Sequence, residues 1–164
     1  MARHVLHDSL KALVKTGDVS KMMAYFNGDD GLEIVAPKSK DDFKVKQSMV
    51  AEIGSGNLSG KTYKGAVAGW GNLTGKEVLE HMITKAGEID GGFDPNTGFD
   101  YTQLISKFAM GAVFYNQAAN NYLGKKMEIG QKPNNKPYKE GAYYTGKEHS
   151  WDEAFLSLIH ISEP

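Results

Sequence analysis

The pattern of apolar and polar residues predicts two short helices at the start of the chain. The first has one apolar face, with positions spaced by four, three and one residues, made by Leu6, Leu10, Leu13 and Val14. Gly17 is suited to end this helix, and Asp18 is suited to cap a second one that stops at Asn27-Gly28. We therefore expect a pair of short amphipathic helices.

Three Ser or Thr residues, each followed three positions later by an acidic residue, predict further helix starts. Ser39-Lys-Asp-Asp42 precedes a helix expected over residues 43–53, with its apolar positions at Phe43, Val45, Met49, Val50 and Ile53. The tetrapeptide Thr-Gly-Lys-Glu occurs twice, at 74–77 and 145–148. It predicts one helix that ends at Gly87 and another that continues through Phe155.

The strongest predicted element covers residues 100–123. Asp100 can cap its start, Gly124 follows its end, and apolar or small residues occupy most of its faces. This distribution predicts a central helix packed on several sides. Because no run of strands stands out elsewhere, the sequence indicates an all-α fold with long loops.

Composition narrows the class of protein. The chain has 164 residues, 40% hydrophobic and 24% charged, with 19 basic against 20 acidic residues, and it is typical of a globular domain without a basic field for nucleic acid. It has no cysteine, which excludes thiolate chemistry and Cys-zinc sites. No stretch reaches the roughly eighteen apolar residues of a transmembrane segment, and residues 1–17 lack the apolar core of a signal peptide. We therefore expect either a cytoplasmic protein or a Met1 that is not the natural start.

Two loops resemble ligand-binding motifs but lack essential positions. GNLSGKT, residues 56–62, has three rather than four residues before its Gly-Lys pair, so we reject a phosphate loop. GSGNLSGK at 54–61 is echoed by GWGNLTGK at 69–76, which favours a repeated turn. DPNTGFD, residues 94–100, lacks the central Gly and the closing glutamate of a calcium loop, and we expect a turn that leads to Asp100.

The densest group of candidate ligands is EHSWDE, residues 148–153. On a helix, His149 lies three residues before Asp152 and four before Glu153, so an imidazole and a carboxylate share one face. This spacing fits two ligands of a metal site whose other ligands come from elsewhere. The alternative is that Glu148 closes a capping box and His149 forms an ordinary helix pair with Glu153. Trp151 is expected to anchor the helix in the core.

Two blocks carry a resemblance to a known family: GFDYTQLISKFAMGAVFYNQAANNYL at 98–123 and YYTGKEHSWDEAF at 143–155. They resemble DUF4856, a family of bacterial envelope proteins related to the imelysins, and the likeness covers most of residues 4–155. The resemblance implies an all-α, imelysin-like helical bundle at the periplasm or cell surface, often held by a lipid anchor. It also implies a link to iron, haem or metal acquisition, with iron or another divalent metal as the candidate cofactor.

Imelysins carry Gly-x-His-x-x-Glu, a motif once associated with metallopeptidases. His149 matches the histidine of this motif, whereas Lys147 replaces the glycine and Asp152 replaces the glutamate. Glu153 supplies a glutamate one residue later. The metal ligands that the resemblance implies are therefore His149, Asp152 and Glu153, in an altered arrangement.

The last nine residues, LSLIHISEP, differ from the Gly-aromatic continuation of the family. They resemble the translation of an adapter used in transposase-based sequencing libraries. We expect one helical domain over 1–155, incomplete at both termini, followed by a non-native tail over 156–164. His160 in that tail is therefore excluded from the candidate ligands.

Three functions remain open from the sequence. The first is a non-catalytic, exported binding protein that handles iron, haem or another metal. The second is a metallohydrolase that uses the same His149 helix. The third is a structural or surface-interaction domain without a metal, in which residues 148–153 form only a cap and helix pairs.

Overall fold

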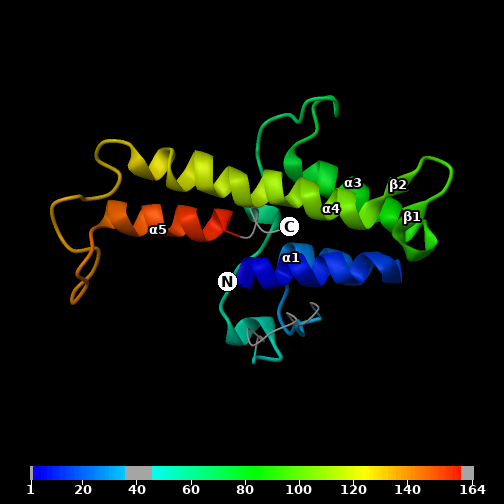
Figure 1. The fold of residues 1–164 in the computed structure, drawn as a ribbon, viewed down its shortest axis with the longest axis horizontal. Coiled ribbons are helices and arrows are strands. Elements are labelled where there is room, and N and C mark those ends of the chain that lie inside the picture. Colours follow the sequence, from blue (N-terminus) through cyan, green and yellow to red (C-terminus); the bar gives the residue numbers. More distant parts are fainter. Residues whose placement is uncertain (1, 36–45, 160–164) are drawn as a thin grey trace. The chain divides into compact units, whose positions relative to one another are not determined.

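The computed structural model of the protein describes residues 2–35 and 46–159, and its secondary structure is mostly helical (Figure 1). The predicted all-α class is confirmed, since the described strands form only one two-stranded hairpin. Within these ranges no helix combines the length and apolar character needed to cross a bilayer. The chain divides into two compact units, residues 1–109 and 110–164.

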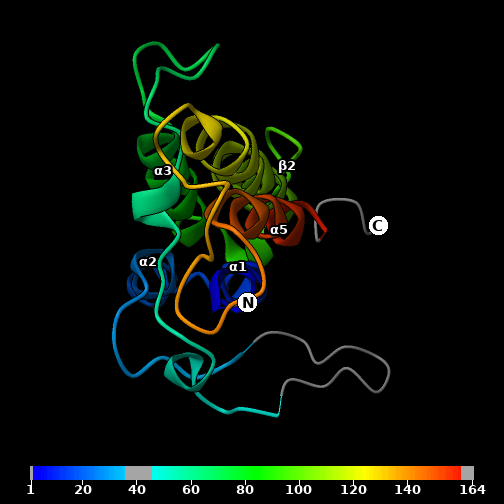
Figure 2. The same ribbon diagram turned by 90° about the vertical axis from the view of Figure 1, so that its left-hand side faces the viewer.

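The first unit contains the four helices α1 (Ala2–Leu13), α2 (Val19–Asn27), α3 (Gly75–Gly87) and α4 (Tyr101–Ala109). Short 3₁₀ turns join or flank them: η1 (Val14–Thr16), η2 (Val50–Glu52), η3 (Ser59–Lys61) and η4 (Asp90–Gly92). Helix α1 packs against α2 and α4, and α3 also packs against α2 and α4 (Figure 2). Fully buried side chains from all four helices form the core, among them Leu6, Leu10, Met22, Phe26, Leu79, Ile83 and Ile105.

The helix ends in this unit follow the predicted capping residues. The Asp18 carboxylate accepts the Lys21 backbone N–H at 2.9 Å at the start of α2. Gly28 ends α2 with a φ of 69°, in the left-handed region that glycine adopts without strain. At α3, the predicted capping box of Thr74 and Glu77 is present. The sequence rules for helix ends therefore hold where both partners are local.

The helix predicted over residues 43–53 is wrong in its described part. Residues 46–49 are not helical, and only one 3₁₀ turn, η2, follows. The backbone instead pairs with the loop after α2: Ile34 N–H donates to Ser48 O, and Val50 N–H donates to Leu32 O. Long-range backbone pairing has thus overridden the helical spacing of the apolar residues. The capping box predicted at 39–42 lies outside the described residues.

A small hairpin precedes α4. Strands β1 (Phe93–Asp94) and β2 (Phe99–Asp100) pair antiparallel. The turn between them is held by Asp94, whose carboxylate accepts the Asn96 N–H at 2.9 Å and the Thr97 hydroxyl at 2.6 Å. These bonds lower the pKa of Asp94 below its ordinary value. The turn expected for DPNTG is confirmed, and it additionally forms a hairpin.

The second unit begins with a helix of unusual pitch. The predicted helix over 100–123 starts as α4, but residues 110–122 form the π-helical segments η5 (Met110–Tyr115) and η6 (Gln117–Tyr122). The Leu123 N–H donates to Ala118 O, five residues back, at 2.8 Å. A sequence period near 3.6 did not distinguish this wider turn from an α-helix.

The 3₁₀ turn η7 (Lys125–Met127) and helix α5 (Gly146–Leu158) complete the second unit. Figure 1 shows α5 running beside η5 and η6, and the three elements are in contact. The core of the second unit is small. It is formed by Ala118, Tyr122 and Ala154, with Leu158 packed against them. Helix α5 is therefore the element that positions the candidate site.

Candidate functional site

The start of α5 is fixed by a reciprocal capping box. The Glu148 N–H donates to the Thr145 hydroxyl at 3.3 Å, and the Thr145 N–H donates to the Glu148 carboxylate at 2.7 Å. The bond from the Thr145 backbone lowers the pKa of Glu148 below its ordinary value. The Glu148 carboxylate therefore caps the start of α5, as predicted by the alternative interpretation in which Glu148 closes a capping box.

The preceding loop folds back on this helix end. The Tyr138 N–H donates to Tyr144 O at 2.8 Å, so residues 138–144 form a closed turn. A side chain at Gly146 would lie 3.1 Å from Pro133 Cδ, which shows how closely the earlier part of the loop approaches. The Lys147 ammonium donates to the Met127 carbonyl at 2.6 Å and ties α5 to η7. These contacts place the ring of Tyr138 over the first turn of α5.

His149 stacks with two tyrosine rings from that loop. The ring centroids of His149 and Tyr138 lie 4.2 Å apart with an interplanar angle of 29°, and those of His149 and Tyr144 lie 5.7 Å apart. The two tyrosines stack on each other at 5.9 Å. We call Tyr138, Tyr144 and His149 the tyrosine–histidine cluster. It is half-exposed, at 39% for Tyr138, 37% for Tyr144 and 31% for the His149 side chain, and the neighbouring Tyr143 is fully exposed.

Of the two predicted carboxylate ligands, Glu153 lies near His149 and Asp152 does not. Glu153 Oε1 lies 3.9 Å from His149 Nε2, whereas Asp152 is exposed and its carboxylate has no hydrogen bond or ion pair with another described residue. Across residues 2–35 and 46–159, no three His, Asp or Glu side chains gather as a metal site would require. The structure thus brings together His149 and Glu153 and leaves Asp152 apart, and metal binding by these residues stays a prediction.

The expectation for Trp151 is wrong. Its side chain is 61% exposed, and the buried residues of α5 are the small ones, Gly146, Ser150, Ala154 and Ser157. Ser150 and Ser157 satisfy their hydroxyls on carbonyls four residues back, at 3.0 and 2.8 Å. Small residues let α5 lie close to η6, which leaves no room for an indole on that face.

Sequence reasoning missed the tyrosine half of the cluster. Tyr138 and Tyr144 lie in a loop eleven and five residues before His149, at no helical spacing from it. The sequence feature that could have indicated them is the aromatic content of YKEGAYY at 138–144, next to a predicted helix start. Two of the described histidines in the first unit have different surroundings: His81 is exposed and its ring lies 5.6 Å from that of Trp70, and His7 is buried with its Nε2 3.1 Å from Ser106 O.

Comparison with known proteins identifies a family for this chain. The model of the family described as Domain of unknown function (DUF4856) matches residues 37–159, well over half of the chain, and includes α3, α4, the π-helical segments and α5. The match extends past Phe155 to Ile159, and the non-native origin expected for the tail stays a prediction. No curated protein and no solved structure matches the chain. The chain therefore belongs to the DUF4856 family.

Proposed function

We propose that this protein is a non-catalytic binding protein of the bacterial cell envelope, and that its tyrosine–histidine cluster binds haem or iron as cargo. The observation that carries the proposal is the cluster itself: an imidazole stacked on the Tyr138 ring, with the Tyr144 ring beside both, and all three partly open to solvent. The envelope location rests on the family resemblance noted in the sequence.

The chemistry of the cluster suits a flat, iron-containing ligand. Imidazole nitrogen and tyrosine oxygen are both established iron ligands in haem proteins. Exposed aromatic rings add a surface on which an apolar macrocycle can pack. Among the described residues, the polar partner of His149 Nε2 is Glu153 at 3.9 Å, beyond the length of a strong hydrogen bond, so Nε2 can exchange this partner for a metal.

A structural role is the second candidate, and the capping box favours it. Glu148 caps α5, His149 pairs with Glu153, and the rings hold the loop to the helix. A metallohydrolase using the same helix needs a third protein ligand and an open coordination position. His149 and Glu153 supply two donors among the described residues, so this remains the less supported alternative.

Titration of the purified chain with ferric haem, followed by its absorbance near the Soret band, tests the proposal. We expect saturable binding that falls at least about tenfold in His149→Ala, which corresponds to loss of about 1.4 kcal/mol of binding free energy. The matched control is His81→Ala, which removes another exposed histidine that contacts an aromatic ring, in the first unit, and should bind as wild type. Separate titrations with Fe(II) and Zn(II) distinguish haem from the free metal.

Equal binding by all three proteins would show adsorption of haem to exposed aromatic residues rather than a site at His149. No binding of haem or of either metal would leave the structural role as the better account.

A further inference from the structure

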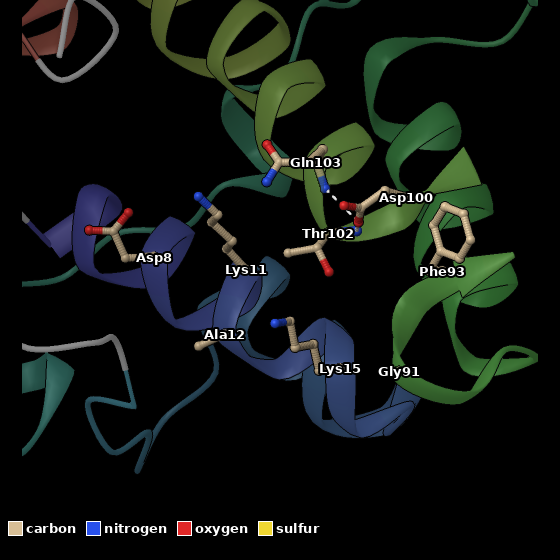
Figure 3. Close-up of a pocket in the computed structure, with 9 residues that line it drawn as sticks. All are labelled: Asp8, Lys11, Ala12, Lys15, Gly91, Phe93, Asp100, Thr102 and Gln103. Atoms are coloured by element: carbon tan, nitrogen blue, oxygen red, sulfur yellow. Dashed lines mark hydrogen bonds between the residues drawn. The ribbon is translucent and has the colours of Figure 1, made fainter. Parts of the chain in front are cut away.

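The first unit contains a hollow that no part of the proposed function uses. Its volume is about 800 Å³, within the range of roughly 300–1,000 Å³ typical of small-molecule sites. Figure 3 shows α1 and η1 on one side of it, the start of α4 on another, and Phe93 of the hairpin at one end. It belongs entirely to residues 8–103, and so to one unit.

Two ammonium groups line this hollow without a carboxylate partner. Lys11 and Lys15 are one helical turn apart, and neither forms an ion pair or a side-chain hydrogen bond with a described residue. The carboxylates of the same hollow are engaged elsewhere. Asp8 Oδ1 lies 3.1 Å from His7 Nδ1, and Asp100 accepts the N–H groups of Thr102 and Gln103 at 2.9 and 3.2 Å. The two lysines and two aspartates of the hollow balance in formal charge, but the ammonium groups lack a partner among the described residues whereas both carboxylates have one.

The hydroxyl of a mostly covered threonine opens into the same space. Thr102 is only 8% exposed and lines the hollow, yet its side-chain oxygen makes no hydrogen bond with another described residue. The side-chain amide of Gln103, also part of the lining, likewise has no partner within the described ranges. The side chain of Thr102 is thus mostly covered while its hydroxyl oxygen stays open to the hollow, where it can bond to water or to a ligand.

The remaining wall is aromatic. The Phe93 side chain is 54% exposed and stands at the mouth of the hollow (Figure 3). It is carried by the hairpin whose turn Asp94 holds, which fixes the backbone beside the ring. An exposed ring next to polar donors suits a ligand that has one less polar face and several hydroxyl groups.

We propose that this hollow binds an acidic sugar, in which a carboxylate or phosphate lies between Lys11 and Lys15. The sugar ring packs on Phe93, and ring hydroxyls bond to Thr102 Oγ1 and the Gln103 amide. Charge-assisted bonds from two lysines give preference for the anion, and the unpartnered Thr102 hydroxyl and Gln103 amide give preference for a ligand with hydroxyl groups.

Isothermal titration of the full chain with glucuronate, glucose 6-phosphate, glucose and inorganic phosphate tests this proposal. We expect glucuronate or glucose 6-phosphate to bind and glucose to bind at least about tenfold more weakly. Whichever anion binds identifies a carboxylate or a phosphate as the charged group. The affinity should also fall with added salt, because the lysines are partly exposed.

Two sets of variants locate the binding. Lys11→Gln with Lys15→Gln should abolish it, whereas Lys21→Gln with Lys107→Gln, which changes the net charge equally outside the hollow, should leave it intact. Thr102→Val keeps the shape of the side chain and should weaken the sugar anion without changing its salt dependence. An amide NMR spectrum of each variant verifies that it is folded.

Several outcomes would overturn the proposal. Inorganic phosphate binding as tightly as either sugar would indicate an adventitious ion only, and glucose binding equally well would exclude a role for the lysines. Binding unaffected by the Lys11 and Lys15 changes would place it elsewhere. Absence of binding by both sugar anions would remove the proposed site.

Discussion

Replacing His149 separates its structural contribution from its chemistry. Aromatic pairs at these separations contribute about 0.5–1.5 kcal/mol each beyond burial, and His149 makes one close pair with Tyr138 and a more distant one with Tyr144. Its pairing with Glu153 at 3.9 Å contributes only about 0.2–0.5 kcal/mol. The ring contacts therefore dominate.

His149→Ala should accordingly destabilise the second unit by about 1–2 kcal/mol. His149→Phe keeps a ring in the stack and should cost less than about 0.5 kcal/mol, as should Glu153→Gln. Urea unfolding followed by circular dichroism gives the total change, and hydrogen exchange of the α5 amides assigns it to this helix.

Equal losses in His149→Ala and His149→Phe would refute the reasoning, because they would show that the imidazole nitrogens, rather than the ring stack, stabilise the loop. A loss in Glu153→Gln as large as in His149→Ala would lead to the same conclusion.

The remaining predictions concern the two capping boxes, the pH dependence of the Glu148 cap, and the close packing around Gly28. Thr145→Ala and Thr74→Ala should each cost about 1 kcal/mol in urea unfolding, because each removes the side-chain acceptor at a helix start; no change in either would contradict the cap assignment. The pKa of Glu148 is lowered below its ordinary value of 4.5, so its contribution is complete above pH 4.5 and should be lost as the pH falls through the lower folded-state pKa. Helical circular dichroism measured from pH 6 to pH 2 should show this loss, and Glu148→Gln should reduce it; an unchanged titration would count against the cap. Gly28→Ala would bring a Cβ into a clash with the Gly56 carbonyl oxygen and should cost more than Gly31→Ala, whose Cβ meets nothing within 4 Å at a similar φ. Thermal unfolding of the two variants checks this ranking.

Local sequence rules predicted the helix ends well. Asp18, Thr74 and Thr145 each bond to a backbone N–H three residues on, so both partners of each cap are encoded within one turn. The same rules failed at residues 46–53, where the backbone pairs with residues 32–34, more than a dozen positions earlier in the chain. Helical spacing of Met49, Val50 and Ile53 carried no information about that pairing.

In the candidate site too, local features could be predicted from the sequence and long-range ones could not. The approach of His149 and Glu153 followed from their spacing on α5, although their separation of 3.9 Å did not. The stacking of Tyr138 on His149 depends on how the 131–145 loop closes, which periodicity does not describe. The exposure of Trp151 depends on the small residues of α5 that face η6, because close helix approach excludes a large side chain there.

The central claim is that His149 in the tyrosine–histidine cluster binds haem iron. The most direct measurement is the ferric haem titration of wild type and His149→Phe side by side, since this variant keeps the ring stack and removes both imidazole nitrogens. We predict a saturable Soret band in wild type that His149→Phe loses or weakens at least about tenfold while remaining folded. The same band with the same midpoint in both proteins would contradict the account.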